Sequence, residues 1–291
     1  MSETGGLAGP ESIAWRINRE IVLLLGWGRA VLLQLAHPLV AAGVADHSVF
    51  VREPALRRRR LLQTVDAMLA LTFGTREEVE GAARGINTIH DHVHGELSEE
   101  TGTFARGTRY SAHDPELLRW VHATLMDSFP LTHRLFVGDL SDQEVERYLR
   151  EAAGLEPLLG IPAGSLPRTR AGLDAYLTHM TQSGAIRVGA DARRIARDLL
   201  NPALPWQMGR LLWPVLWLSR LPTIGLLPPE IREQYGFRWT RGHALALRAL
   251  SAVARCIVPR TPGVLRHWPI ARRAAARASG DRGATPAAAP T

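Results

Sequence analysis

The chain has 291 residues, of which 46% are hydrophobic and 22% charged, a composition that suits a globular domain and excludes collagenous, low-complexity and fully disordered chains. Its single cysteine, Cys256, excludes an internal disulfide framework and a multi-thiolate metal site, and the absence of lysine excludes a Schiff-base nucleophile and a P-loop lysine. All 35 basic residues are arginine; they give a net charge of +7 but are spread along the chain, so no nucleic-acid partner is predicted.

Helical periodicity runs along almost the whole chain, and no stretch shows sustained period-two alternation. In chain order the expected helices are 12–35, 39–47, 54–73, 76–94, 115–129, 142–153, 171–183, 191–200, 229–235 and 240–257. Capping-box patterns at Thr75 and Ser141, and Asp114 followed by Pro115, mark three of the helix starts, and Gly95 is expected to end the fourth helix. The sequence therefore predicts an all-α, single-domain helical bundle.

Residues 12–277 are expected to form this domain, between a flexible N-terminus, 1–11, and a disordered tail rich in Ala and Pro, 278–291. The first residues lack the basic and apolar regions of a secretory signal, and the expected location is the cytoplasm. The segment 205–228 holds three tryptophans and could either lie on a bilayer surface or form a buried hairpin lid over an apolar pocket.

The predicted helix 76–94 carries three of the eleven histidines near its C-terminal end. On a helical wheel His90 falls inside the apolar stripe and His94 on its shoulder, whereas Asp91 and His92 point away. Because an unpartnered buried imidazole is costly, His90 is expected either to bond a neighbour or to ligate a metal.

The helical pattern leaves three interpretations of His90 open. The first is a hydrogen-bonded core residue. The second is a zinc or iron site of a hydrolase, in which His90 and His94 ligate together, although Asp91 stands where the zincin pattern has its glutamate. The third is a haem protein, because a haem iron takes four nitrogens from the macrocycle and needs one axial imidazole. An apolar pocket in a helical bundle suits that cofactor.

Two upstream segments add polar candidates. Arg57, Arg60 and Thr64 share one face of helix 54–73 and could clamp haem propionates and donate a hydrogen bond to dioxygen, although Thr64 could equally be an ordinary intrahelical hydroxyl. His37 stands directly before a proline, where the helix breaks, and is expected to bond freed carbonyls; it is also a candidate cofactor contact.

The remaining histidines carry less information. His47 is expected at the surface near a helix cap. Six others stand alone in the sequence, namely His113, His122, His133, His179, His243 and His267.

Several ordered stretches carry a family resemblance: LLQLAHPLVAAGVADHS, RRRRLLQT followed by FGT, INTIHDHVHG, YSAHDPELLRWVHATL, PPEIREQYG and LRHWPIARRA. They resemble the family of the oxygenase MpaB and the rubber oxygenase, or latex-clearing protein, catalytic domain, and the resemblance covers nearly the whole chain, from about Ser12 to about Arg277. The resemblance implies a globin-like all-α bundle, a haem b held by one axial histidine, and dioxygen-dependent cleavage of a carbon–carbon double bond in an isoprenoid-like substrate.

Carried over by position, the resemblance makes His90 the axial ligand. Asn87 and His94 stand where the rubber oxygenase has flanking arginines, and they would orient the His90 ring. The rubber oxygenase motif Arg-x-x-Lys-Thr reads Arg60-Leu-Leu-Gln63-Thr64 here, so Gln63 replaces a lysine. Glutamine can donate a hydrogen bond but cannot supply an amine ligand to iron.

The favoured interpretation is thus a haem b oxygenase that takes dioxygen and a lipophilic small molecule, with Arg60, Gln63 and Thr64 on the distal face and an unnamed electron donor. The alternatives are a histidine-ligated zinc or iron hydrolase and a haem-binding carrier or sensor without turnover.

Overall fold

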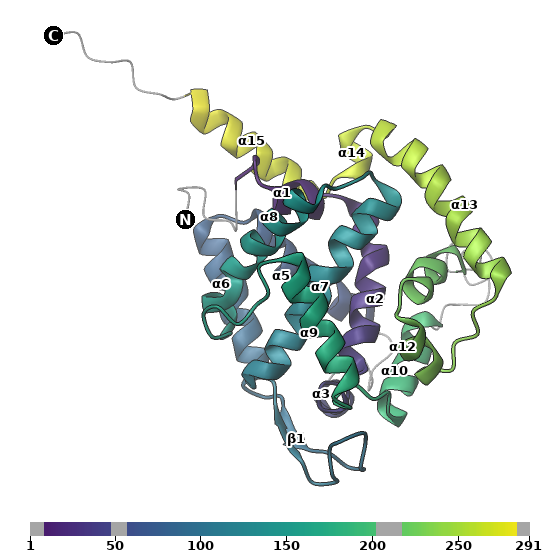
Figure 1. Cartoon of the computed structure of the whole chain (residues 1–291). Coiled ribbons are helices and arrows are strands. Elements are labelled where there is room, and N and C mark those ends of the chain that lie inside the picture. The colour runs from purple at the N-terminus through teal and green to yellow at the C-terminus, as the bar shows by residue number, and fades with distance from the viewer. Residues whose placement is uncertain (1–8, 48–56, 202–216, 284–291) are drawn as a thin grey trace.

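The computed structural model describes residues 9–47, 57–201 and 217–283, and it shows an all-α protein with one short β-ribbon. In the N-terminal half the elements are α1 (Ile13–Asn18), η1 (Ile21–Leu23), α2 (Leu24–Leu35), α3 (Pro38–His47), α5 (Arg57–Phe73), α6 (Arg76–His90), β1 (His94–Glu96), β2 (Arg109–Ser111) and α7 (Pro115–Phe136). In the C-terminal half they are α8 (Asp142–Ala152), η3 (Ala153–Leu159), α9 (Arg170–Gln182), α10 (Ala190–Leu200), α12 (Pro229–Gln234), α13 (Arg241–Ile257), η4 (Val258–Arg260), α14 (Gly263–Arg266) and α15 (Pro269–Gly283). The predicted fold class is confirmed, and Figure 1 shows α2 and α7 near the middle of the bundle.

Local signals set several helix starts as predicted. Thr75 and Ser141 each accept a hydrogen bond from the N3 amide of the following helix, and Glu78 and Glu144 reach back to complete both capping boxes. Asp114 caps α7 by accepting from the Glu116 amide. These starts depend on residues within one turn of each other, which is why the sequence alone predicts them.

The end of α7 was predicted too early. The helix runs past Phe129, through Pro130, and ends at Phe136. A proline inside a helix removes one backbone hydrogen bond. Here the side chains on both sides of it are buried, and their packing outweighs that loss.

The predicted continuous helix 12–35 is divided into α1, η1 and α2. At the break, the backbone of Glu20 forms an isolated antiparallel bridge with His267, and the Trp268 amide donates to the Arg19 carbonyl at 3.0 Å. Arg266 Nε also donates to Glu20 Oε2 at 2.7 Å. The segment before α15 therefore forms hydrogen bonds with the backbone and side-chain groups at the break in the first helix. Helical periodicity does not reveal this tertiary interaction.

The centre of the bundle depends on a close approach to α2 at its glycines. A Cβ atom on Gly26 would lie 2.2 Å from Thr132 Oγ1 of α7, and one on Gly28 would lie 2.6 Å from Thr223 Oγ1 in the helical stretch 217–225. Side chains at these two positions would push the neighbouring helices away. Around this contact, one apolar cluster draws buried side chains from α1, α2, α3, α5, α6, α7, α8, α9, α10 and α12.

A two-stranded ribbon, unforeseen from the sequence, follows α6. β1 pairs antiparallel with β2, with Gly95 opposite Tyr110. Only three residues on each side pair, too few for an alternating pattern to stand out.

The C-terminal boundary also differs from the expectation. α15 continues to Gly283, and Ala278, the first residue of the expected tail, is buried. Residues 205–216 of the tryptophan-rich segment lie outside the described residues. The described part is helical over 217–225, and Trp217 packs near Phe136 and Leu221.

Within the described residues, no single helix combines the length and apolar character needed to cross a bilayer. One pair of helices, Ile21–Leu35 and Pro38–His47, passes that test jointly but is bent by 105°.

Arg29 forms a buried ion pair at the centre of the fold. Its Nη2 lies 2.6 Å from Asp127 Oδ2, and the two side chains are 5% and 12% exposed. Nη1 donates to Ser128 Oγ at 2.6 Å, and Nε donates to the Leu226 carbonyl at 2.7 Å. One guanidinium therefore joins α2, α7 and the turn that follows residues 217–225.

We predict that Arg29→Met lowers the free energy of unfolding by about 3–5 kcal/mol, because methionine fills similar space but leaves the Asp127 carboxylate buried without its cation. Urea denaturation measures the loss. The matched control is Arg76→Met, because Arg76 pairs with Glu80 on the surface and is 72% exposed, and its loss should stay within about 1 kcal/mol. Equal losses in the two variants would contradict a special role for the buried pair.

Candidate functional site

A cavity of about 790 Å³ lies among α2, α3, α5, α6, α7 and α10, a size that accommodates a cofactor or a drug-sized ligand. Its wall is mostly aliphatic. The apolar lining includes Trp27, Val31, Leu35, Leu39, Val40, Val44, Met68, Ile86, Ile89, Leu117, Leu118, Val121, Leu125, Leu159, Ile161, Ile195 and Leu199. The polar lining residues are few: Gln34, His47, Gln63, Thr64, Thr88, His90, His92, Tyr110, Ser111 and His122. An apolar hollow with a few polar groups is the usual form of a small-molecule site.

His90 is the last residue of α6, and its side chain lines this cavity. Its Nδ1 is buried and has no hydrogen-bond partner among the described residues. The pKa of His90 is lowered, first because burial removes water from the charged ring and then because of the nearby His113, with Asp91 opposing both. The imidazole is therefore neutral at pH 7 and has an unsatisfied ring nitrogen, a combination that fits a ligand to a metal.

His113 and Asp91 stand behind His90. His113 Nε2 lies 2.8 Å from Asp91 Oδ1, and the His113 ring meets the His90 ring edge-on, with centroids 5.9 Å apart. His113 was expected to stand alone, and this expectation is wrong. The only sequence signal for this contact was the place of His113 in the YSAHDP stretch. A separation of 23 residues from His90 does not predict where the two side chains lie relative to each other.

The predicted helix 76–94 ends four residues early, at His90, and this changes the position of His94. The Val93 amide donates to the His90 carbonyl at 3.0 Å in a tight turn, and the chain then enters β1. His94 is consequently an exposed strand residue, not the neighbour of His90 on a helical face. Gly95 does not end a helix but lets the ribbon close, because a Cβ atom there would lie 2.6 Å from Tyr110 Oη.

The early helix end also removes the basis of the zinc-hydrolase interpretation. His90 and His94 no longer lie one helical turn apart. Among the described residues, no group of three His, Cys, Asp or Glu side chains is placed to hold a metal ion. A further correction concerns His92, which was expected to point away but lines the cavity, with Nδ1 2.8 Å from the Thr88 carbonyl.

Asn87 was expected to orient the His90 ring. Its Nδ2 instead donates to the Leu158 carbonyl of η3 at 3.3 Å, and Asn87 is not among the residues that line the cavity. Asn87 therefore ties α6 to η3.

On α5, Gln63 and Thr64 both line the cavity, and both are exposed. The structure thus brings these two predicted residues to the same hollow as His90. Arg57 and Arg60 belong to α5, but their side chains lie outside the described residues.

His37 has a different role from the one expected. It immediately precedes α3, and its Nδ1 accepts a hydrogen bond from the Leu39 amide at 3.3 Å, so it caps that helix instead of bonding freed carbonyls. The ring lies 5.2 Å from the Phe104 ring and does not line the cavity. Burial lowers the pKa of His37 to about 4, with the Asp114 carboxylate opposing it.

Sequence reasoning missed a polar cluster at the α3 end of the cavity. Tyr110 Oη donates to Asp46 Oδ2 at 2.6 Å and lies 3.3 Å from His47 Nε2, which is 2.9 Å from the His94 carbonyl. Burial and the Asp46 carboxylate raise the pKa of the Tyr110 phenol. His47 therefore lines the cavity and is not simply a surface residue. Its position depends on the pairing of α3 with the ribbon, which no local pattern indicates.

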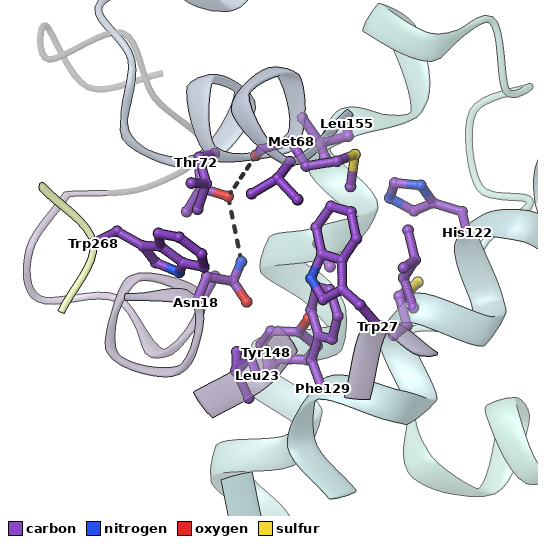
Figure 2. Close-up of a pocket in the computed structure, with 16 residues that line it drawn as sticks. Asn18, Leu23, Trp27, Met68, Thr72, His122, Phe129, Tyr148, Leu155 and Trp268 are labelled. Carbon is purple, nitrogen blue, oxygen red and sulfur yellow. Dashed lines mark hydrogen bonds between the residues drawn. The ribbon is translucent and has the colours of Figure 1, made fainter. Parts of the chain in front are cut away.

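A second, smaller cavity of about 40 Å³ shares part of its lining with the large one, and Figure 2 shows the side chains around the smaller cavity. Trp27, Met68, His122 and Leu125 line both cavities and so form a shared wall. His122 is buried, and its burial lowers its pKa to about 4 against a hydrogen bond with the Ala152 backbone.

The fold and site define an all-α protein with a large apolar cavity, where the lining residue His90 has a buried ring nitrogen without a hydrogen-bond partner among the described residues. Residues 15–256 match the family described as ER-bound oxygenase mpaB/B'/Rubber oxygenase, catalytic domain, and the chain belongs to that family. The resemblance seen in the sequence is thereby confirmed, and membership in an oxygenase family supports an oxidoreductase activity. No curated protein and no solved structure matches the chain.

We predict that His37→Asn flattens the pH dependence of stability. The folded pKa of about 4 lies below the unfolded value of 6.5, so the unfolded chain binds one more proton as the pH falls from 6.5 to 4, and stability falls with it. This one histidine should cost about 2 kcal/mol between pH 7 and pH 5. Asparagine keeps the cap but does not titrate. The free energy of unfolding of the variant, measured by urea denaturation, should therefore depend less steeply on pH across that range, by about one bound proton. An unchanged slope would show that His37 is not held neutral.

Proposed function

We propose that this protein is a haem b-dependent oxygenase that uses dioxygen to oxidise or cleave a carbon–carbon double bond in a lipophilic, isoprenoid-like molecule. The observation that carries the proposal is His90, a half-buried residue on the wall of the 790 Å³ apolar cavity, whose buried Nδ1 has no hydrogen-bond partner among the described residues. Membership in an oxygenase family supports the reaction class.

His90 would hold the iron through its ring. The His113 ring, itself paired with Asp91, lies edge-on to the His90 ring and would restrict its rotation, a role that hydrogen-bonded neighbours commonly play behind a metal ligand. When bound, the haem would supply the redox chemistry with dioxygen, which no side chain of this protein can perform.

The rest of the cavity would bind and orient the substrate. Its aliphatic walls favour an apolar chain and exclude water from the reacting double bond. Gln63 and Thr64 are the hydrogen-bond donors of the α5 wall and would face developing negative charge. Because Gln63 has no ammonium group, it would not supply an amine ligand to the haem.

We predict that His90→Ala folds but retains little haem, because the axial imidazole is the only protein ligand in the proposal. The Soret absorbance per mole of purified, haem-reconstituted protein measures the loss. His179→Ala is the control, because His179 is exposed on α9 and lies outside both cavities. Full haem content in the His90 variant would contradict the assignment of His90 as the haem ligand. Oxygen consumption by the wild type with an unsaturated lipid then separates an enzyme from a haem carrier.

We further predict that Gln63→Lys shifts the Soret band of the ferric protein toward a six-coordinate form and slows the binding of imidazole, because the new amine competes with imidazole for the iron. Gln182→Lys introduces the same change at an exposed site at the end of α9 and should alter neither property. If the spectrum and the imidazole on-rate of the Gln63 variant equal those of the wild type, residue 63 does not face the cofactor.

A further inference from the structure

The outer face of α13 and α14 is unusually apolar for a protein surface. Five large aliphatic side chains there are more than half exposed: Leu245 at 62%, Val253 at 55%, Ile257 at 58%, Val264 at 59% and Leu265 at 71%. Together they account for most of the strongly exposed aliphatic residues in the described part of the chain. A group of strongly exposed aliphatic side chains on neighbouring elements can mark an interaction site.

The opposite face of α13 is already occupied. Leu247 and Ser251 are buried, and Leu247 forms an apolar cluster with Phe136 and Leu221. Figure 1 shows α13 at the edge of the molecule, with α14 following at its C-terminal end. The helix α13 therefore has two apolar faces, of which one packs on the protein and the other faces outward.

Charge identifies the partner of this outer face. Between Gln234 and Gly280 the chain has nine arginines and no Asp or Glu. On the helical wheel Arg241 and Arg248 fall within about 60° of Leu245, so they flank the exposed aliphatic residues. Both are exposed, and neither forms an ion pair with a described residue.

We propose that α13 and α14 form a peripheral docking surface for an anionic lipid bilayer. Exposed aliphatic side chains flanked by exposed arginines match the chemistry of such a surface, in which the apolar groups enter the interface and the cations meet lipid phosphates. A second copy of the chain fits less well, because a symmetric contact would bring arginines of this acid-free segment against each other.

This inference goes beyond the proposed oxygenase function and does not depend on haem. A lipophilic substrate partitions into bilayers, so docking would bring the protein to the phase in which such a substrate concentrates.

The single cysteine offers a direct probe of docking. Cys256 is exposed and falls about 20° from Leu245 on the wheel, so it lies on the same outer face. After labelling of the full-length protein with an environment-sensitive fluorophore, we expect a blue-shifted, brighter emission on vesicles of phosphatidylcholine with one-third phosphatidylglycerol. Pure phosphatidylcholine vesicles should cause little change, and 0.5 M salt should weaken the response.

Variants separate the apolar and basic contributions. Leu245→Glu should lower the vesicle partition coefficient roughly tenfold or more, and the double variant Arg241→Gln/Arg248→Gln roughly 25-fold, since each arginine near an anionic surface is worth roughly fivefold. Ala175→Glu on α9 and the pair Arg84→Gln/Arg106→Gln make matched changes at exposed positions outside this face and should bind as the wild type does. Circular dichroism confirms that each variant is folded.

Two results would overturn the proposal. One is binding of anionic vesicles by the Leu245 and arginine variants with wild-type affinity. The other is a concentration-dependent dimer in analytical ultracentrifugation that Leu245→Glu dissociates, together with no change in probe emission on vesicles, because this face would then join two copies of the chain.

Discussion

The close approach of α2 and α7 at Gly26 is the constraint on which the rest of the structure depends. A single methyl group there would collide with Thr132, so the backbone of α2 at Gly26 packs directly against the Thr132 side chain of α7. The buried pair of Arg29 and Asp127 fixes the same contact electrostatically. Further along α2, Val31, Gln34 and Leu35 face the large cavity, where helices are held apart. An open hollow costs stability, because its lining loses packing partners.

The histidines show how environment, not residue type, distinguishes a candidate ligand. Burial lowers the pKa of His37, His122 and His133 to about 4, and each of them has a hydrogen-bond partner. Such residues are ordinary components of a core. His90 differs because its buried Nδ1 has no partner in the described structure, and a buried polar atom without a partner is costly unless something else occupies the site.

The interior and the exterior of the protein are both suited to apolar molecules, in different ways. The cavity encloses aliphatic side chains beneath the helices, whereas α13 and α14 expose theirs beside arginines. The two regions lie on different elements of the fold, since α13 and α14 contribute no residue to the cavity wall. The cavity lining and this outer face can thus be altered by separate substitutions.

The sequence by itself determined what depends on neighbours within a helical turn. It predicted the all-α class, the capping boxes at Thr75 and Ser141, and the candidacy of His90, and its long motifs indicated the family. Local propensity and periodicity encode the fold class and the helix caps directly.

Only the tertiary structure decided where the chain leaves those patterns. The bridge from Glu20 to His267 divides the first helix, and the pairing of Gly95 with Tyr110 carries His94 away from His90. Contacts across 22 and 64 residues bring His113 to Asp91 and Tyr110 to Asp46. Such contacts are stabilised by burial between distant segments, and no periodicity within one segment specifies the partner.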